Sequence, residues 1–314
     1  MKSEKLVLYQ IFTRLYGNRN TTRKENGTLE ENGCGKMNDF TPTVLKHIRQ
    51  MGVSHIWYTG IIRHATQTDY SKFGIAKDHP EVVKGKAGSP YAITDYYDID
   101  PDLATNVNKR MDEFEKLVER THQVGMKVVL DFVPNHVARQ YRSDQLPFGE
   151  KQFGEADNAD FAFSPTNNFY YIPHTELQGH FDMQGDAPLP YHEYPAKATG
   201  NDKFDAYPDK NDWYETVKLN YGIDYQNGWQ RYFNPEPDTW HKMLHILLFW
   251  AGKLIDGFRC DMAEMVPAEF WQWATDKVKF AYPDKIFIGE VYNPAEYRRY
   301  IAAGFDYLYD KVGM

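Results

Sequence analysis

From Asp256 to Asp261 the chain reads Asp-Gly-Phe-Arg-Cys-Asp, directly after the apolar pair Leu254 and Ile255. This stretch decides the fold. Residues two apart on a strand point to the same face, so the guanidinium of Arg259 and the carboxylate of Asp261 share a face where the strand ends. Charge in such a place is costly unless it is paired or used. The stretch therefore predicts the end of a buried strand, with a charge pair that needs a partner or a purpose.

Strand and helix patterns alternate on both sides of this stretch. Strands are predicted at 6–12, 53–58, 127–133, 254–261, 286–291 and 305–309, and helices at 40–51, 108–124, 239–253, from 267 onward, and at 294–303. Residues 127–133 are almost unbroken apolar sequence, which is typical of a parallel strand covered on both faces. Alternation of this kind predicts βα units around a parallel sheet.

The alternation is interrupted between residues 138 and 238. This segment has no clean period and is rich in Pro, Gly, Asn, Asp and Tyr. A structureless loop of that length is improbable inside a compact domain. We therefore expect a small inserted subdomain at 138–238, between a first part at 1–137 and a second part at 239–314.

Composition excludes some partners. The 314 residues carry a net charge of −8 and no run of Lys or Arg, which argues against nucleic acid or an anionic membrane as partner. Aromatic residues make up 16% of the chain, which fits either a large aromatic core or a cleft that stacks on sugars or bases. The sequence gives no indication of the oligomeric state.

The N-terminal sequence, the apolar runs and the cysteines bear on where the protein is located and on whether it has disulfides. No secretory leader and no apolar run of transmembrane length is visible, so the chain as given is expected to be cytoplasmic, or secreted or periplasmic if a leader has been removed. Cys34 and Cys260 are far apart in the sequence, and we expect two free thiols.

Polar groups end three of the predicted strands. The third strand contains Asp131 and leads to Asn135 and His136, the fourth ends in Arg259 and Asp261, and the fifth ends in Glu290. In βα architectures the active site lies at these carboxyl ends. Neighbouring strands are ~4.8 Å apart, so carboxylates on adjacent ends would face each other at about 5–5.5 Å, the gap used by retaining glycosidases.

The surroundings of the two carboxylates suggest different roles. Arg259 is expected to lower the pKa of Asp261, which suits a nucleophile, and burial is expected to raise the pKa of Glu290, which suits a general acid. Taken singly, each motif also has an ordinary structural interpretation, as an ion pair, a strand end or a turn. Their order at successive strand ends is what favours an active site.

Three segments together resemble a known family. Asp131-Phe132-Val133-Pro134-Asn135-His136, Gly257-Phe258-Arg259-Cys260-Asp261 and Gly289-Glu290 are similar to the first three signature regions of the α-amylase family of glycoside hydrolases. Tyr91 with residues 95–101 resembles the segment after that family's second strand, the long insert resembles its domain B, and residues 219–222 resemble a further short motif there.

The resemblance implies a fold, an activity and a set of site residues. The fold would be a (β/α)8 TIM-type barrel, here with about six βα units and domain B after strand three. The chain would be a retaining hydrolase of α-glucosidic bonds in starch-like glucans or maltooligosaccharides, acting by double displacement. The implied roles are nucleophile Asp261, acid and base Glu290, sugar contacts Tyr91 and His136, supports Arg259 and Asp131, and a calcium ligand Asn135, with no organic cofactor.

Two departures from the family pattern affect what is expected. Where starch-cleaving members often carry a Lys-His pair after the nucleophile, this chain has Glu264 and Met265, although the Met265 carbonyl could still serve a calcium ion. The fourth signature region and strands seven and eight do not occur before Met314. We therefore expect a fragment with two open sheet edges and little activity alone.

Three alternatives stay open. The chain could be a non-catalytic sugar-binding or interaction module derived from the enzyme, or a transglycosidase of the same family. Metal-dependent hydrolysis is a third, weaker alternative, because His174 and His180 lie in the insert without a helical His-Glu-x-x-His pattern.

Overall fold

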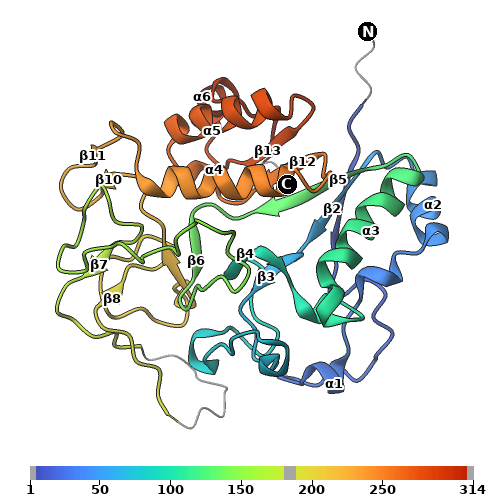
Figure 1. The fold of residues 1–314 in the computed structure, drawn as a ribbon, viewed down its shortest axis with the longest axis horizontal. Coiled ribbons are helices and arrows are strands. Elements are labelled where there is room, and N and C mark those ends of the chain that lie inside the picture. Colours follow the sequence, from blue (N-terminus) through green and yellow to red (C-terminus); the bar gives the residue numbers. More distant parts are fainter. Residues whose placement is uncertain (1–4, 180–188, 310–314) are drawn as a thin grey trace.

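A parallel sheet of six strands forms the centre of the molecule (Figure 1). The computed structural model describes residues 5–179 and 189–309. In spatial order the sheet strands are β1 (Leu8–Phe12), β2 (His55–Thr59), β5 (Lys127–Phe132), β12 (Gly257–Cys260), β13 (Ile286–Glu290) and β14 (Tyr307–Tyr309). Every neighbouring pair is parallel, which confirms the predicted sheet. Within the described residues, β1 and β14 are the two edges.

Helices connect these strands. Their bounds are α1 (Leu29–Asn32), α2 (Pro42–Gln50), α3 (Arg110–Gln123), α4 (Asp238–Ala251), α5 (Ala268–Ala281) and α6 (Tyr297–Ala302). The start of α2 follows the predicted pattern, since the Thr41 side chain accepts from the Val44 amide and Pro42 takes the first helical position. The α3 helix stops before Gly125, whose φ of 76° few other residues adopt without strain.

The two faces of the sheet carry different side chains. On one face Ile56, Leu130 and Phe258 join the main hydrophobic core under the helices. On the other face Trp57, Val129 and Ile288 form a separate small cluster. Because successive side chains alternate between faces, residues 131, 259 and 261 continue this second face beyond the small cluster. The core therefore fixes which side chains the strand ends present on the face away from the helices.

The connecting segments hold short strands. Paired antiparallel, these are β3 (Ile62–His64) with β4 (Ile93–Ile99), β6 (His136–Ala138) with β9 (Thr216–Lys218), β7 (Tyr171–Ile172) with β8 (Ala196–Lys197), and β10 (Ile223–Asp224) with β11 (Gln230–Arg231). Most are only two or three residues long, too short to show a period in the sequence. The pairing of β6 with β9 ties the loop after β5 to the end of the irregular segment.

Some predicted elements need adjustment. The stretch 294–303, predicted as one helix, is a 3-10 turn followed by α6. The 3-10 turns are Met37–Asp39, Ser71–Phe73, Pro80–Val82, Pro101–Leu103, Val107–Lys109, Ala263–Met265 and Pro294–Glu296. Cys34 and the buried Cys260 are unpaired, as predicted. In the described ranges, no helix is both long and apolar enough to cross a membrane.

Candidate active site

One arginine joins the ends of three neighbouring strands. The guanidinium of Arg259, on β12, donates to Oδ1 of Asp261 at 2.7 Å, to Oδ1 of Asp131 at 3.1 Å and to Oε2 of Glu290 at 2.7 Å. The strand register explains the contact with Asp131, because Arg259 on β12 lies directly opposite Asp131 on β5. The three carboxylates that the sequence placed at successive strand ends thus share one cation.

Three aromatic rings enclose this guanidinium. Its carbon lies 4.7 Å from the centre of the Trp57 ring, 5.6 Å from that of Tyr91 and 5.5 Å from that of Tyr309. The Tyr309 hydroxyl accepts from Nε of Arg259 at 2.7 Å, and the Trp57 indole donates to Asp131 at 2.8 Å. Trp57 and Tyr309 were not predicted as site residues. Their signal in the sequence is that Tyr309 is an aromatic residue at the carboxyl end of β14 and Trp57 lies two residues before the end of β2.

The pKa of Asp261 moves in the direction opposite to the prediction. Burial, together with the charges of Glu290 and Asp131, raises the pKa of Asp261 to about 7, although the guanidinium of Arg259 acts to lower it. The prediction assumed that Arg259 serves one carboxylate. It contacts three carboxylates, and one positive charge cannot neutralise three negative ones. The excess negative charge of the buried cluster favours uptake of a proton.

Glu290 also differs from the prediction. Burial acts to raise its pKa, but the charge of Arg259 and hydrogen bonds from Tyr292, Met262 and Tyr309 outweigh burial and hold the pKa below its usual value. Besides Arg259, the Tyr292 hydroxyl donates to Oε1 at 2.6 Å and the Met262 amide donates to Oε2 at 2.9 Å. Met262 adopts a left-handed backbone, with φ of 44°, immediately after Asp261. These donors come from loop geometry that the strand pattern did not reveal.

His136 and Asn135 occupy different places although they are adjacent in sequence. His136 borders the same cavity as Arg259. Burial and then the charge of Lys218 lower the pKa of His136 to about 3, so its imidazole is neutral. The side chain of Asn135 is fully engaged in protein contacts: it donates to the Gly200 carbonyl at 2.7 Å and accepts from Nζ of Lys218 at 2.8 Å.

Glu264, which was noted above as a departure from the family pattern, holds a loop. Its Oε2 accepts from the backbone amides of Tyr292 at 3.1 Å and Asn293 at 3.0 Å. Those amides belong to the second and third residues after Glu290, so Glu264 fixes the segment that brings the Tyr292 hydroxyl to the Glu290 carboxylate. This contact was missed because it joins two loops that are distant in sequence.

The cluster opens into a cavity of about 360 Å³. Its polar and aromatic lining combines predicted and unpredicted residues, namely Gln10, Trp57, Lys84, Ser89, Tyr91, His136, Trp213, Glu215, Thr216, Arg259, Asp261, Met262, Glu290 and Tyr309. Asp131 lies behind Arg259 rather than on the cavity wall. The arrangement can supply one carboxylate as nucleophile, a second as proton donor, and ring faces for a flat ligand.

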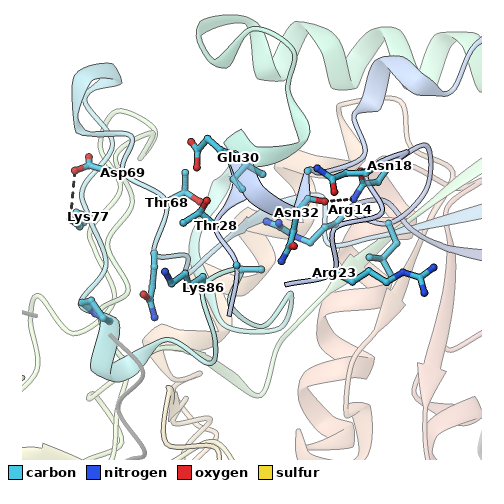
Figure 2. A pocket seen from close by; sticks show the side chains of 18 residues that line it. Arg14, Asn18, Arg23, Thr28, Glu30, Asn32, Thr68, Asp69, Lys77 and Lys86 are labelled. Carbon is cyan, nitrogen blue, oxygen red and sulfur yellow. Dashed lines mark hydrogen bonds and ion pairs between the residues drawn. The ribbon is translucent and has the colours of Figure 1, made fainter. Parts of the chain in front are cut away.

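A larger cavity of about 920 Å³ lies between residues 14–33 and 67–87, and Figure 2 shows its lining. The two carboxylates in its lining are Glu30, on α1, and Asp69, in a loop, and Asp69 pairs with Lys77 at 3.6 Å. Across the described ranges, no group of three or more His, Cys, Asp or Glu side chains is placed to hold a metal ion. His180, weighed above together with His174, lies outside the described residues.

Comparison with known proteins decides the family. A family model described as alpha amylase, catalytic domain, matches residues 10–305. The chain belongs to the alpha-amylase family. Among its curated relatives, Alpha-amylase 3 of Dictyoglomus thermophilum is 28% identical to this chain over 233 residues. The match covers 71% of this chain and 38% of that protein. A cyclomaltodextrinase of Bacillus sp is 24% identical over 304 residues, 91% of this chain and 40% of that protein.

Solved structures agree on the fold. An alpha-amylase from Geobacillus thermoleovorans, complexed with acarbose, aligns with a TM-score of 0.55 at 21% identity and covers 96% of this chain and 51% of that chain. The chain thus spans about half the length of this solved structure, and 38% of the Dictyoglomus relative. The alpha-amylase catalytic domain is a (β/α)8 barrel, and the open parallel sheet seen here corresponds to part of such a barrel.

Proposed function

We propose that this alpha-amylase family chain carries the machinery of a retaining hydrolase for α-glucosidic bonds, with starch-like glucans or maltooligosaccharides as substrates. The observation that carries the proposal is the contact of one guanidinium with both Asp261 and Glu290 at the wall of one cavity. The proposed division of the chain is a barrel part at 1–137, an inserted domain B at 138–238 and a second barrel part at 239–314.

The proposed reaction has two displacements. The Asp261 carboxylate attacks the anomeric carbon while Glu290 donates its proton to the leaving glycosidic oxygen, which breaks the C–O bond and leaves a glycosyl ester on Asp261. The Glu290 carboxylate then takes a proton from water, and the water oxygen attacks the anomeric carbon. Asp261 leaves as carboxylate and Glu290 is protonated again. The product keeps the anomeric configuration of the substrate.

The reaction needs one proton on the pair of carboxylates. In the free protein the pKa directions favour this proton on Asp261, so the reactive form is the tautomer with the proton on Glu290. Because Arg259 contacts both groups, the pair titrates as a unit. Tyr91 offers a ring face and His136 a neutral imidazole at the cavity wall to the sugar, and Asp131 positions Arg259.

Trapping the ester tests the mechanism directly. α-Maltosyl fluoride carries a leaving group that needs no protonation, so Glu290→Gln should still form the ester on Asp261 but hydrolyse it slowly. Intact mass spectrometry should then show the chain plus one maltosyl group, and peptide mapping should place that group on Asp261. In a form of the protein that turns over a chromogenic maltooligosaccharide, Asp261→Asn should lower kcat by at least about 10⁴-fold, as expected when a covalent nucleophile is removed. Turnover unaffected by Asp261→Asn would refute the assignment.

Two other outcomes have a distinct signature in the same assay. A transglycosidase would form the same ester but pass its glycosyl group to a sugar hydroxyl, so added maltose would yield longer oligosaccharides in place of free maltose. A sugar-binding module would quench tryptophan fluorescence on titration with maltooligosaccharides, through Trp57 and Trp213 in the cavity lining, without releasing chromophore. The chain spans 38% and 40% of two curated relatives, so binding of sugar without turnover is tested as well.

A further inference from the structure

Lys218 is a buried lysine at the junction between the strand ends and the irregular segment. It is the last residue of β9, where it pairs with His136 of β6, and its exposed fraction is 1%. Its Nζ donates to Oδ1 of Asn135 at 2.8 Å and lies 2.5 Å from Oδ1 of Asp202. The Tyr225 ring lies beneath it, with its centre 5.2 Å away. A cation thus occupies the space between an amide oxygen and a carboxylate.

The contacts of Lys218 bear on the calcium ion that the family resemblance placed at Asn135. Calcium takes six to eight oxygen ligands at about 2.3–2.6 Å, carboxylates and carbonyls above all. Here the one oxygen of the Asn135 side chain already accepts a bond from an ammonium group. The Asp202 carboxylate, which could complete such a site, is engaged by the same group. A divalent cation beside a buried ammonium would be repelled, so the residues present do not fit calcium.

We propose that the ammonium of Lys218 is a built-in cation that replaces a calcium ion at this junction, so that the chain folds and holds its active-site loops without calcium. The ammonium joins three segments that are far apart in the sequence. Asn135 follows β5, Asp202 lies in the loop at 199–203, and Lys218 ends β9. The amide of Asn135 extends the link, because its nitrogen donates to the Gly200 carbonyl in the same loop as Asp202.

The position of this cation also affects the neighbouring imidazole. His136 follows Asn135 directly, and the charge of Lys218 contributes to its lowered pKa. A tethered lysine supplies this positive charge at any calcium concentration. Its three donors fit two oxygen acceptors and a ring face, a smaller set of ligands than calcium needs.

The first experiment measures thermal unfolding of the purified protein in excess EDTA and in millimolar CaCl₂. The proposal predicts the same Tm in both, and no stoichiometric binding of radioactive calcium in equilibrium dialysis. A Tm that falls in EDTA and returns with CaCl₂, or one calcium ion bound per chain, would overturn it. Neither measurement needs turnover, so the result is independent of the proposed hydrolase function.

The second experiment removes the charge. Lys218→Met keeps the length of the stem and should lower the Tm by about 5 °C or more, because the buried Asn135 oxygen loses its donor and the partly exposed Asp202 carboxylate loses its cation. Lys203→Met is the matched control: Lys203 lies in the loop that contains Asp202 and pairs with Asp212 at 2.9 Å, but its side chain is 29% exposed. Its Tm should change by about 1 °C or less.

Two results would contradict the role of Lys218. Equal Tm values for Lys218→Met and the unchanged protein would show that the ammonium is dispensable. A larger loss for Lys203→Met than for Lys218→Met would show that surface pairing matters more than the buried cation. If Lys218→Met does not fold, the calcium measurements on the unchanged protein still decide whether a metal ion or the lysine occupies the junction.

Discussion

Two buried clusters in this molecule are each built on an arginine and carboxylates near strand ends, and they differ in charge balance. In the first, Arg14 pairs with Asp102 and lies 3.9 Å from Asp100, while His64 contacts Asp100 at 2.9 Å. Both ring nitrogens of His64 face oxygens, since the other lies 3.1 Å from the Ala65 carbonyl. An imidazole between two acceptors is best satisfied when doubly protonated. Two cations therefore face two carboxylates.

In the second cluster, one guanidinium faces three carboxylates. The consequences for the pKa values are opposite. Despite complete burial, the charge of His64 and its hydrogen bond hold the pKa of Asp100 below its ordinary value, whereas burial raises the pKa of Asp261. The comparison teaches that an arginine beside an aspartate does not itself mark an active site. What indicates an active site is an excess of buried negative charge at the wall of a cavity. Such an excess lowers stability, so a catalytic role is the better explanation for it.

The largest effect is expected at the balanced cluster. Asp100→Asn leaves His64 and Arg14 short of a buried counter-charge and should lower the free energy of unfolding by about 3–5 kcal/mol. The lowered pKa of Asp100 means that its contribution is present above the ordinary value of 3.8 and is lost as the pH falls through the folded-state pKa. Urea denaturation at pH 7 and at pH 2, well below the ordinary value of 3.8, should show the larger loss at pH 7.

The control for this loss is an exposed aspartate. Asp112, in the first turn of α3, is exposed, and Asp112→Asn should change the free energy of unfolding by no more than about 0.5 kcal/mol. A similar small change for Asp100→Asn would mean that the balanced cluster contributes little to stability, and the comparison would fail.

The same substitution at the unbalanced cluster should have the opposite sign. The raised pKa of Asp261, about 7, means that the folded protein loses stability as the pH rises from the ordinary value of 3.8 through about 7. Asp261→Asn removes that cost and keeps an oxygen acceptor for Arg259. Its free energy of unfolding at pH 8 should exceed that of the unchanged protein by roughly 1–3 kcal/mol, even though turnover is lost.

Measurement at two pH values separates this effect from general stabilisation. The gain from Asp261→Asn should shrink at pH 5, where the Asp261 carboxyl of the unchanged protein is largely protonated in the folded state. A destabilised Asp261→Asn at pH 8 would show that Arg259 does compensate its three carboxylates, and would restore the direction expected from the sequence alone.

Much of the fold and part of the site follow from sequence pattern. The strands and helices were predictable because β1, β2, β5, β12 and β13 are apolar runs and the main helices have apolar stripes with clear starts and stops. The strand-end positions of Asp131, Arg259, Asp261 and Glu290 then followed from period-two alternation, because a parallel register sets neighbouring strand ends side by side.

What could not be predicted lies in long-range contacts between loops. The amide of Met262 turned toward Glu290 and the ammonium of Lys218 on Asn135 depend on backbone paths through irregular segments. There the strands are two or three residues long, so no period indicates which side chains meet. The pKa directions were wrong for the same reason, because they depend on counting all the charges and donors in the cluster.

A smaller effect is expected at the loop that supports the unbalanced cluster. Glu264→Ala removes the acceptor for the amides of Tyr292 and Asn293 and should lower kcat/KM by about tenfold, the equivalent of one lost hydrogen bond to a charged group. Glu264→Gln keeps one oxygen acceptor and should retain most of the activity. Equal losses for both variants would indicate a role for the charge rather than for holding the loop.

The smallest change tests how the unbalanced cluster divides its proton. The Tyr292 hydroxyl donates to Glu290 at 2.6 Å and helps to hold the pKa of Glu290 low. Tyr292→Phe removes this donor, so the pKa of Glu290 should rise. Since Glu290 must be protonated to act as acid, the alkaline limb of the pH profile of kcat/KM should move to higher pH, by up to about one pH unit.

Tyr300→Phe is the control, because in the described contacts the Tyr300 hydroxyl donates only to the Glu264 and Val266 carbonyls. A shift of the limb to lower pH in Tyr292→Phe would mean that the proton lost on that limb is not the one held by Glu290.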